Sequence, residues 1–209
     1  HKDQAMCHGA TPLFIAAQEG HLDVVRHLVE VGAQRDQATN DGATPLMIAA
    51  AKGHLDVVHH LVEVGAHKDS ALNDGATPLY IAAQEGHLDV VRHLVEVGAH
   101  KDQATNDGAT PLMIAAAKGH LDVVQHLTEV GAHKDQARND GATPLMIAAH
   151  RGHLDVVRHL VDIGARKNEA TRDTGETALH AAAEMGHVEI VRFLIERGAD
   201  SHATTRSGR

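Results

Sequence analysis

The stretch that decides the fold is residues 76–108, ATPLYIAAQEGHLDVVRHLVEVGAHKDQATNDG, because the chain repeats it along most of its length. Its opening tetrapeptide, Ala-Thr-Pro-Leu, occurs five times at a spacing of 33 residues, at 10–13, 43–46, 76–79, 109–112 and 142–145. A weaker copy, Glu-Thr-Ala-Leu, follows after 34 residues at 176–179. A fixed period of this length predicts a stack of repeats that bury one another's apolar sides. Such stacks mostly offer extended binding surfaces.

Each repeat is predicted to form two short helices and a polar loop. Thr77 is a typical N-cap residue, and Pro78 at the first helical position loses no hydrogen bond there. Gly86 ends this first helix, whose apolar residues are Leu79, Ala82 and Ala83. A second helix begins after His87, with apolar residues at helical spacing: Leu88, Val90, Val91, Leu94 and Val95. A glycine ends it, and Asn106-Asp107-Gly108 indicates a turn. Since such short helices are unstable alone, stacking must stabilise them.

The pattern resembles the ankyrin repeat over nearly the whole chain. The shared residues are Thr-Pro-Leu-x-x-Ala-Ala, Gly-His-Leu-Asp-Val-Val and Gly-Ala at the 33-residue period. The resemblance implies an all-α solenoid of stacked helix-turn-helix units with protruding hairpin loops. It also implies protein–protein binding through a concave groove and the loop tips.

Two departures from the family pattern stand out. The histidine expected after Thr-Pro-Leu is kept only at His180 and is replaced elsewhere, by Phe14, Met47, Tyr80, Met113 and Met146. In the family that histidine helps to hydrogen-bond neighbouring loops, so we expect apolar packing to take its place. Thr174 is one extra residue in the loop before the last repeat, and it is expected to bulge that loop without breaking the stack.

The period divides the chain into a short tail and six repeats. Residues 1–9 match the end of a repeat whose front is missing, so they are interpreted as the tail of a truncated preceding repeat. The predicted repeats cover 10–42, 43–75, 76–108, 109–141, 142–174 and 175–209. Both ends therefore suggest that the sequence is a segment of a longer protein.

The composition of the chain limits which kinds of partner and which cell compartment are expected. The net charge is −9 with histidines neutral, which argues against nucleic-acid binding because that needs a basic face. The single cysteine, Cys7, excludes an internal disulfide and indicates an intracellular, cytoplasmic protein. No apolar run approaches the ~18 residues of a membrane helix, so no membrane insertion is expected.

No catalytic or cofactor motif is found, so we predict no enzyme activity and no cofactor. The chain has 20 histidines, but those of one row lie on successive stacked helices about 8–10 Å apart, too far to share a metal whose ligand nitrogens lie about 2 Å from it. The row in the Gly-His steps is therefore interpreted as structural: His21, His54, His87, His120, His153 and His187.

A second histidine row is interpreted as part of a solvated outer face, with an acid-responsive surface as the sharper hypothesis. Asp89, His93 and Glu96 lie at i, i+4 and i+7 of one helix, so the acids are expected to raise the pKa of His93. On a solvated face such ion pairs contribute little. Similar trios surround His27, His60, His126 and His159.

The candidate binding surface is the groove side of the first helices. In the family the variable position after the histidine tends to face the groove, and here it is isoleucine in five repeats. The predicted partner-binding residues are Ile15, Gln18, Glu19, Ile48, Lys52, Ile81, Gln84, Glu85, Ile114, Lys118, Ile147 and Arg151. The alternative is that the isoleucines pack sideways on one another and the charges pair between repeats. The loop tips near Thr39-Asn40, Leu72-Asn73, Thr105-Asn106 and Arg138-Asn139 are a second candidate surface.

Two functions remain open from the sequence. The first is a protein–protein interaction module that binds a partner protein through the groove and the loop tips. The alternative is an architectural scaffold subunit that docks through its terminal repeats. An engineered consensus protein is a third possibility, which the uneven drift between repeats disfavours.

Overall fold

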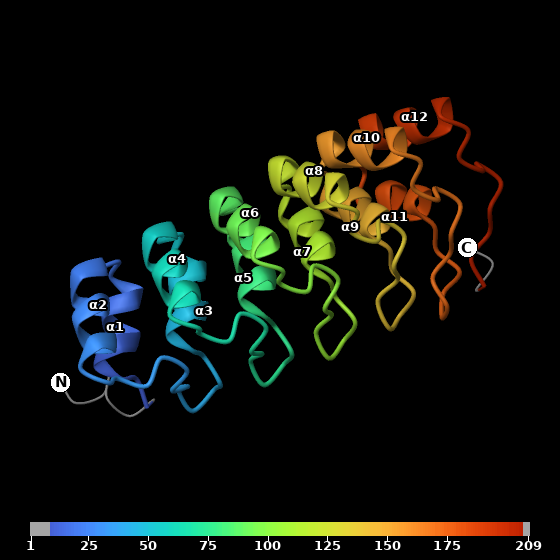
Figure 1. Cartoon of the computed structure of the whole chain (residues 1–209). Coiled ribbons are helices and arrows are strands. Elements are labelled where there is room, and N and C mark those ends of the chain that lie inside the picture. Colours follow the sequence, from blue (N-terminus) through green and yellow to red (C-terminus); the bar gives the residue numbers. More distant parts are fainter. Residues whose placement is uncertain (1–8, 207–209) are drawn as a thin grey trace. The chain divides into compact units, whose positions relative to one another are not determined.

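A computed structural model describes residues 9–206, and the helices in this range follow the predicted pattern of short pairs (Figure 1). The chain divides into two compact units, residues 1–106 and 107–209. The described part of unit 1 holds α1 (Pro12–Gln18), α2 (Leu22–Glu30), α3 (Pro45–Lys52), α4 (Leu55–Glu63), α5 (Pro78–Glu85) and α6 (Leu88–Glu96). That of unit 2 holds α7 (Pro111–Lys118), α8 (Leu121–Glu129), α9 (Pro144–Arg151), α10 (Leu154–Asp162), α11 (Ala178–Glu184) and α12 (Val188–Glu196).

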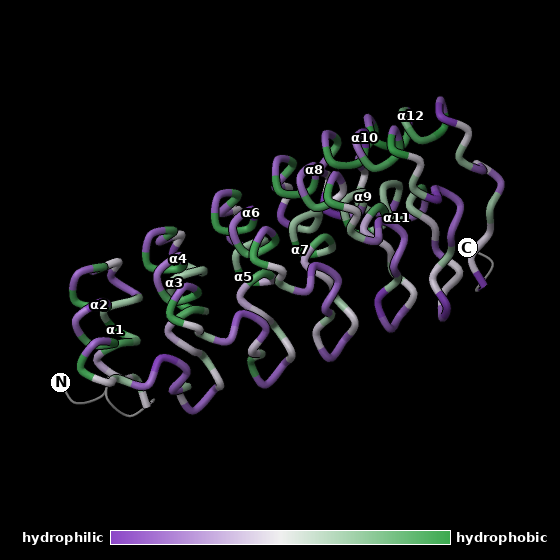
Figure 2. The backbone as a smooth tube through the Cα atoms, viewed as in Figure 1, coloured by the Kyte–Doolittle hydropathy of each residue, from purple (hydrophilic) through white to green (hydrophobic). Residues whose placement is uncertain are grey.

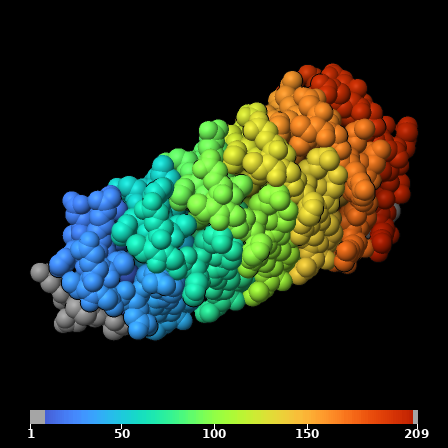
Figure 3. Space-filling view, viewed as in Figure 1, coloured from blue at the N-terminus to red at the C-terminus, as the bar shows by residue number. Residues whose placement is uncertain are grey.

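The twelve helices and the absence of strands between residues 9 and 206 confirm the all-α architecture. The odd-numbered helices are called inner helices here and the even-numbered ones outer helices. Each inner helix contacts the outer helix that follows it and the inner helices of adjacent repeats in its unit. Successive repeats within each unit appear as adjoining bands in the space-filling view (Figure 3). Of the predicted tail, residues 1–9, only Gly9 belongs to the described residues.

The start and end of the inner helices are set by the residues that the sequence singled out. The Thr77 side chain accepts a hydrogen bond from the Tyr80 N–H at 3.2 Å, and Pro78 occupies the first turn. Gly86 caps the other end with φ +77°, a left-handed conformation that glycine adopts without strain. The predicted N-cap and stop signals are thus confirmed.

The core runs between the two helix layers of each unit. In the third repeat Leu79, Ala82, Ala83, Val90, Val91 and Leu94 are at most 1% exposed. The predicted positions Leu88 and Val95 are only half-buried. Hydrophobic residues gather on the helices, whereas the loops are largely hydrophilic (Figure 2).

The loops protrude on one side of each unit and hydrogen-bond to the loops of adjacent repeats (Figure 1). In unit 1 the Asn106 N–H donates to the Asp74 carbonyl at 2.8 Å, and the Asn106 side-chain amide donates to the Asn73 carbonyl at 2.9 Å. A Cβ on Gly75, whose φ is +91°, would lie 2.9 Å from the Asn106 nitrogen. Only glycine allows this close approach of the two loops.

Thr174 widens the last loop as expected. In the earlier loops a glycine N–H donates three residues back, as from Gly141 to the Arg138 carbonyl. In the last loop the Gly175 N–H donates four residues back, to the Thr171 carbonyl at 3.1 Å. The hydroxyls of Thr171 and Thr174 lie 2.7 Å apart across the enlarged turn.

Apolar packing replaces the missing family histidine, as predicted. Met47 and Met113 are each 1% exposed and Met146 is 5% exposed. The Met47 sulfur also lies 3.5 Å from the Thr44 N–H, which donates to it. At His180, where the histidine is kept, the ring Nδ1 accepts from the Thr177 N–H at 3.3 Å.

The first histidine row joins neighbouring repeats and is structural, as interpreted from the sequence. The Nε2–H groups donate to carbonyls of the preceding repeat at 2.9 to 3.1 Å, in the pairs His54–Gln18, His87–Ala51, His153–Ala117 and His187–His150. Each ring also covers a glycine. A Cβ on Gly53, whose φ is +72°, would lie 2.7 Å from His87 Nδ1.

Candidate protein-binding surface

The predicted binding residues lie on the exposed side of the inner helices, which is called the inner-helix face here. Ile48, Ile81, Ile114 and Ile147 are half-buried, as are Gln18 and Gln84. Ile15 is 47% exposed, and the five charged residues are exposed: Glu19, Lys52, Glu85, Lys118 and Arg151. In the described part of unit 1, Glu19, Lys52 and Glu85 form no ion pair with one another. Because they are also exposed, their side chains are open to solvent there.

In unit 1 the inner-helix face is hollowed between α3 and α5. This surface, called hollow A, has a volume of about 400 Å³. Helix residues and loop residues contribute to it alike, and its lining is Asp41, Ala43, Met47, Ile48, Ala51, Leu72, Asp74, Ala76, Tyr80, Ile81, Gln84 and Glu85. It brings together four of the predicted residues: Ile48, Ile81, Gln84 and Glu85.

The charges around hollow A are all negative. Asp41 and Asp74 come from two successive loops, and Glu85 comes from the last turn of α5. Two of them accept hydrogen bonds from neutral donors: Asp74 accepts from the Ala76 N–H at 3.0 Å, and Glu85 accepts from the Gln84 amide at 2.9 Å. No lysine, arginine or histidine is among its lining residues.

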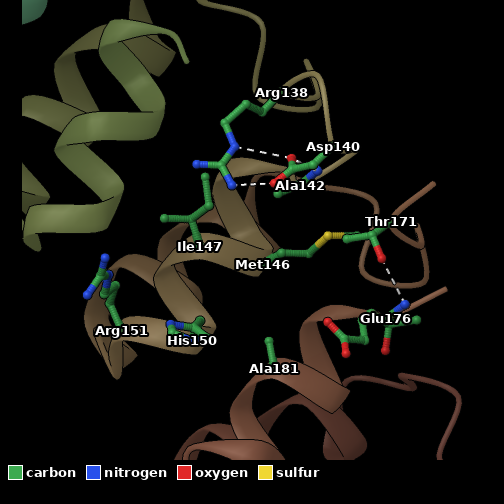
Figure 4. Close-up of a pocket in the computed structure, with 11 residues that line it drawn as sticks. Arg138, Asp140, Ala142, Met146, Ile147, His150, Arg151, Thr171, Glu176 and Ala181 are labelled. Carbon is green, nitrogen blue, oxygen red and sulfur yellow. Dashed lines mark hydrogen bonds and ion pairs between the residues drawn. The ribbon is translucent and has the colours of Figure 1, made fainter. Parts of the chain in front are cut away.

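In unit 2 a second hollow, hollow B, lies between α9 and α11 (Figure 4). It has a volume of about 260 Å³ and contains two predicted residues, Ile147 and Arg151. Ala181, which also lines it, stands where the other repeats carry isoleucine. The other lining residues are Arg138, Asp140, Ala142, Met146, His150, Thr171, Glu176 and Thr177.

Hollow B carries both signs of charge. The Arg138 guanidinium pairs with the Asp140 carboxylate, with Nε 3.1 Å from Oδ1. This hydrogen bonding holds the pKa of Asp140 below its usual value, and the Ala142 N–H adds to the effect against the opposing influence of burial. The remaining charged residues, Arg151 and Glu176, are of opposite sign.

The remaining predicted residues, Ile15, Gln18, Glu19, Lys52, Ile114 and Lys118, line neither of these two hollows. The helix pattern missed the acidic loop residues Asp41 and Asp74 and the pair Arg138–Asp140. Arg138 itself belongs to the predicted loop-tip surface, and for Asp41, Asp74 and Asp140 the only signal was that they adjoin those loop tips.

The expectation that carboxylates raise the pKa of His93 is wrong. Its pKa is lowered, first by burial and then by the charge of His59, which together outweigh Glu96 and Glu63. The ring stacks on His59 of the preceding repeat, with ring centroids 4.8 Å apart. Asp89, expected to face His93, instead accepts from the Val90 N–H at 2.8 Å at the start of α6.

Residues 9–206 contain no group of three or more histidine, cysteine or acidic residues arranged to hold a metal ion. Nor does any helix in this range have the length and apolar character to cross a membrane.

Comparison with known proteins assigns the family. A family profile described as ankyrin repeats (3 copies) matches residues 1–71, 65–138 and 130–205. The crystal structure of the human ASB11 ankyrin repeat domain is similar, with a TM-score of 0.88 and 29% identity over 96% of this chain and 89% of that chain. A search of curated proteins finds no match.

The chain therefore belongs to the ankyrin repeat family, whose members are generally protein–protein interaction modules. The twelve described helices fit about six repeats. Since 646 solved chains match this chain, structural similarity alone does not identify its partner.

Proposed function

We propose that this protein binds another protein through the inner-helix face and the adjoining loops, without catalysing a reaction. The observation that supports this proposal most is the pair of hollows, one in each unit, whose apolar surface is bordered by charged residues. Interfaces combine apolar anchors with a polar rim in the same way. The single cysteine favours a cytoplasmic location, and the net charge of −9 disfavours nucleic acid as the partner.

Site-specific photo-crosslinking tests the proposal. The crosslinker p-benzoylphenylalanine is placed at Ile81 or Ile147 on the inner-helix face, and at Arg92 or Arg158 on the outer helices as the matched controls. In cells of the source organism, we expect discrete crosslinked proteins from the first two positions and none from the controls. Crosslinks confined to Arg92 and Arg158 would show that the wrong face has been chosen.

Docking through the terminal repeats is a second candidate, favoured by apolar side chains exposed on the first and last helix pairs. Val24 on α2 is 48% exposed, whereas Val57, Val90, Val123 and Val156 at the same position are fully buried. On α12 Ile195 is 46% exposed. Native mass spectrometry of complexes formed by the Val24→Lys and Ile195→Lys variants tests this role, since loss of a complex from either variant supports it.

A further inference from the structure

Hollow A combines an apolar surface with charge of a single sign. We propose that it binds a segment of the partner protein in which a large apolar side chain lies next to an arginine or lysine. The inference rests on the proposed function and names the chemistry of the partner at one site.

The apolar part of hollow A explains why the partner segment is expected to carry a large apolar side chain. Ile48, Leu72, Tyr80 and Ile81 are half-buried, so each contributes apolar surface to the hollow, with the buried Met47 beneath them at 1% exposed. Covering this apolar surface releases water from it, which favours binding. At about 400 Å³ the hollow lies near the lower end of the range for ligand sites. One or two side chains therefore fit it better than a large cofactor.

The acidic residues of hollow A explain why the partner segment is expected to carry an arginine or lysine. Asp41, Asp74 and Glu85 surround the apolar surface from three different segments, and no cationic residue lines hollow A. A cation placed there gains attraction that a neutral side chain does not. Tyr80, the only tyrosine in the chain, adds an aromatic ring that attracts a cation over its face. Lys52, the nearest cation of the predicted binding residues, lies at the end of α3 outside the lining.

Hollow B shows what the same position in the fold becomes without this charge imbalance. There Arg138 pairs with Asp140 and neutralises it. The two other charged lining residues, Arg151 and Glu176, are of opposite sign. Hollow B consequently has no preference for a cationic side chain. The net charge of −9 for the whole chain also favours a basic partner at long range.

The chain itself supplies variants that keep the fold. Glu85→Lys introduces the residue found at the same position in two other repeats, Lys52 and Lys118. Tyr80→Met introduces the residue of three others, Met47, Met113 and Met146. The control is Glu30→Lys, which makes the same charge change at an exposed residue of outer helix α2, away from the inner-helix face and outside hollow A.

The experiment selects a phage library of random dodecapeptides on the full chain and measures the enriched peptides by fluorescence anisotropy in 150 mM salt. We expect enriched sequences with leucine, isoleucine or phenylalanine next to arginine or lysine. Glu85→Lys should weaken their binding by about tenfold or more and Tyr80→Met by a few fold, whereas Glu30→Lys should stay within about twofold. Circular dichroism melting checks that all three variants remain folded.

Three outcomes would overturn the inference: enrichment of acidic or purely apolar peptides, equal weakening by Glu85→Lys and Glu30→Lys, or no enriched peptide at all. The photo-crosslinking experiment separates this failure from failure of the proposed function. If Ile147 crosslinks a protein while hollow A binds no basic peptide, the function stands and the assignment of hollow A falls. Crosslinking from the outer helices alone would remove both.

Discussion

His87 illustrates how a single side chain ties two repeats together. Its Nε2–H donates to the Ala51 carbonyl at 3.1 Å, and its ring covers Gly53. His21 holds the same place at the start of α2, but its side chain is exposed. The two histidines therefore share a local helix position and differ in the contact between repeats.

We expect His87→Ala to lower the free energy of unfolding by about 1 kcal/mol, the net value of one hydrogen bond. His21→Ala is the matched control and should change it by less than about 0.5 kcal/mol. Urea denaturation followed by circular dichroism measures both. Equal losses would mean that the effect comes from the helix start and not from the bond to Ala51.

His93 leads to a pH dependence opposite to the one expected from the sequence. Its folded pKa lies below the ordinary histidine value of about 6.5, because burial and His59 disfavour the charged form. As the pH falls through 6.5, the unfolded chain therefore takes up the proton first. The contribution of His93 to stability is complete above this value and declines below it, until the lower folded pKa is reached.

The test compares the parent protein with His93→Gln by urea denaturation between pH 5 and 8. The free-energy difference, parent minus variant, should decrease as the solution is acidified below the ordinary histidine value. An increase on acidification would restore the original expectation that Glu63 and Glu96 dominate.

The helices depend on stacking because each is only 7 to 9 residues long. Leu94 in α6 is fully buried, whereas Leu55 in α4 is 36% exposed. Both lie in outer helices, Leu94 within α6 and Leu55 at the first residue of α4.

Leu94→Ala should cost about 2–5 kcal/mol of unfolding free energy, because it removes buried hydrocarbon and leaves a cavity. Leu55→Ala should cost well under about 1.5 kcal/mol. Guanidinium denaturation measures both changes. If the two variants lost the same stability, the assignment of Leu94 to the core would be incorrect.

Each unit is held together by contacts between adjacent repeats, as between α1 and α3 and between α3 and α5. The inner helices present nearly the same residues to one another, with Leu-x-x-Ala-Ala in α1, α3 and α5. Removing one whole repeat therefore leaves surfaces that match.

Deletion of residues 43–75 is expected to give a folded protein that lacks two helices and melts cooperatively at a lower temperature. Deletion of residues 43–59, about half a repeat, is the control and should abolish cooperative melting, because it removes α3 and the first five residues of α4 and leaves the remainder of α4 without a helix partner. Circular dichroism at 222 nm follows both. A whole-repeat deletion that melts without cooperativity would show that the repeats are not interchangeable.

The candidate surface was only partly predictable. Ile81 and Glu85 were found because helical spacing places them on one side of α5. Asp41 and Asp74 come from loops, whose approach to the inner helices depends on bonds between neighbouring loops such as Asn106 to Asp74. His93 was misjudged for the same reason, since its strongest charged neighbour, His59, belongs to the preceding repeat.

The sequence by itself determined the repeat period, which is read directly from the recurring residues. It also determined the helix starts at Thr77 and its counterparts, the glycine stops and most of the buried apolar positions, because these depend on residues a few positions apart. Only the tertiary structure decided the charge sign of each hollow and the direction of the His93 pKa. These depend on side chains about one repeat apart or from separate loops, which the stacking of neighbouring repeats brings into contact.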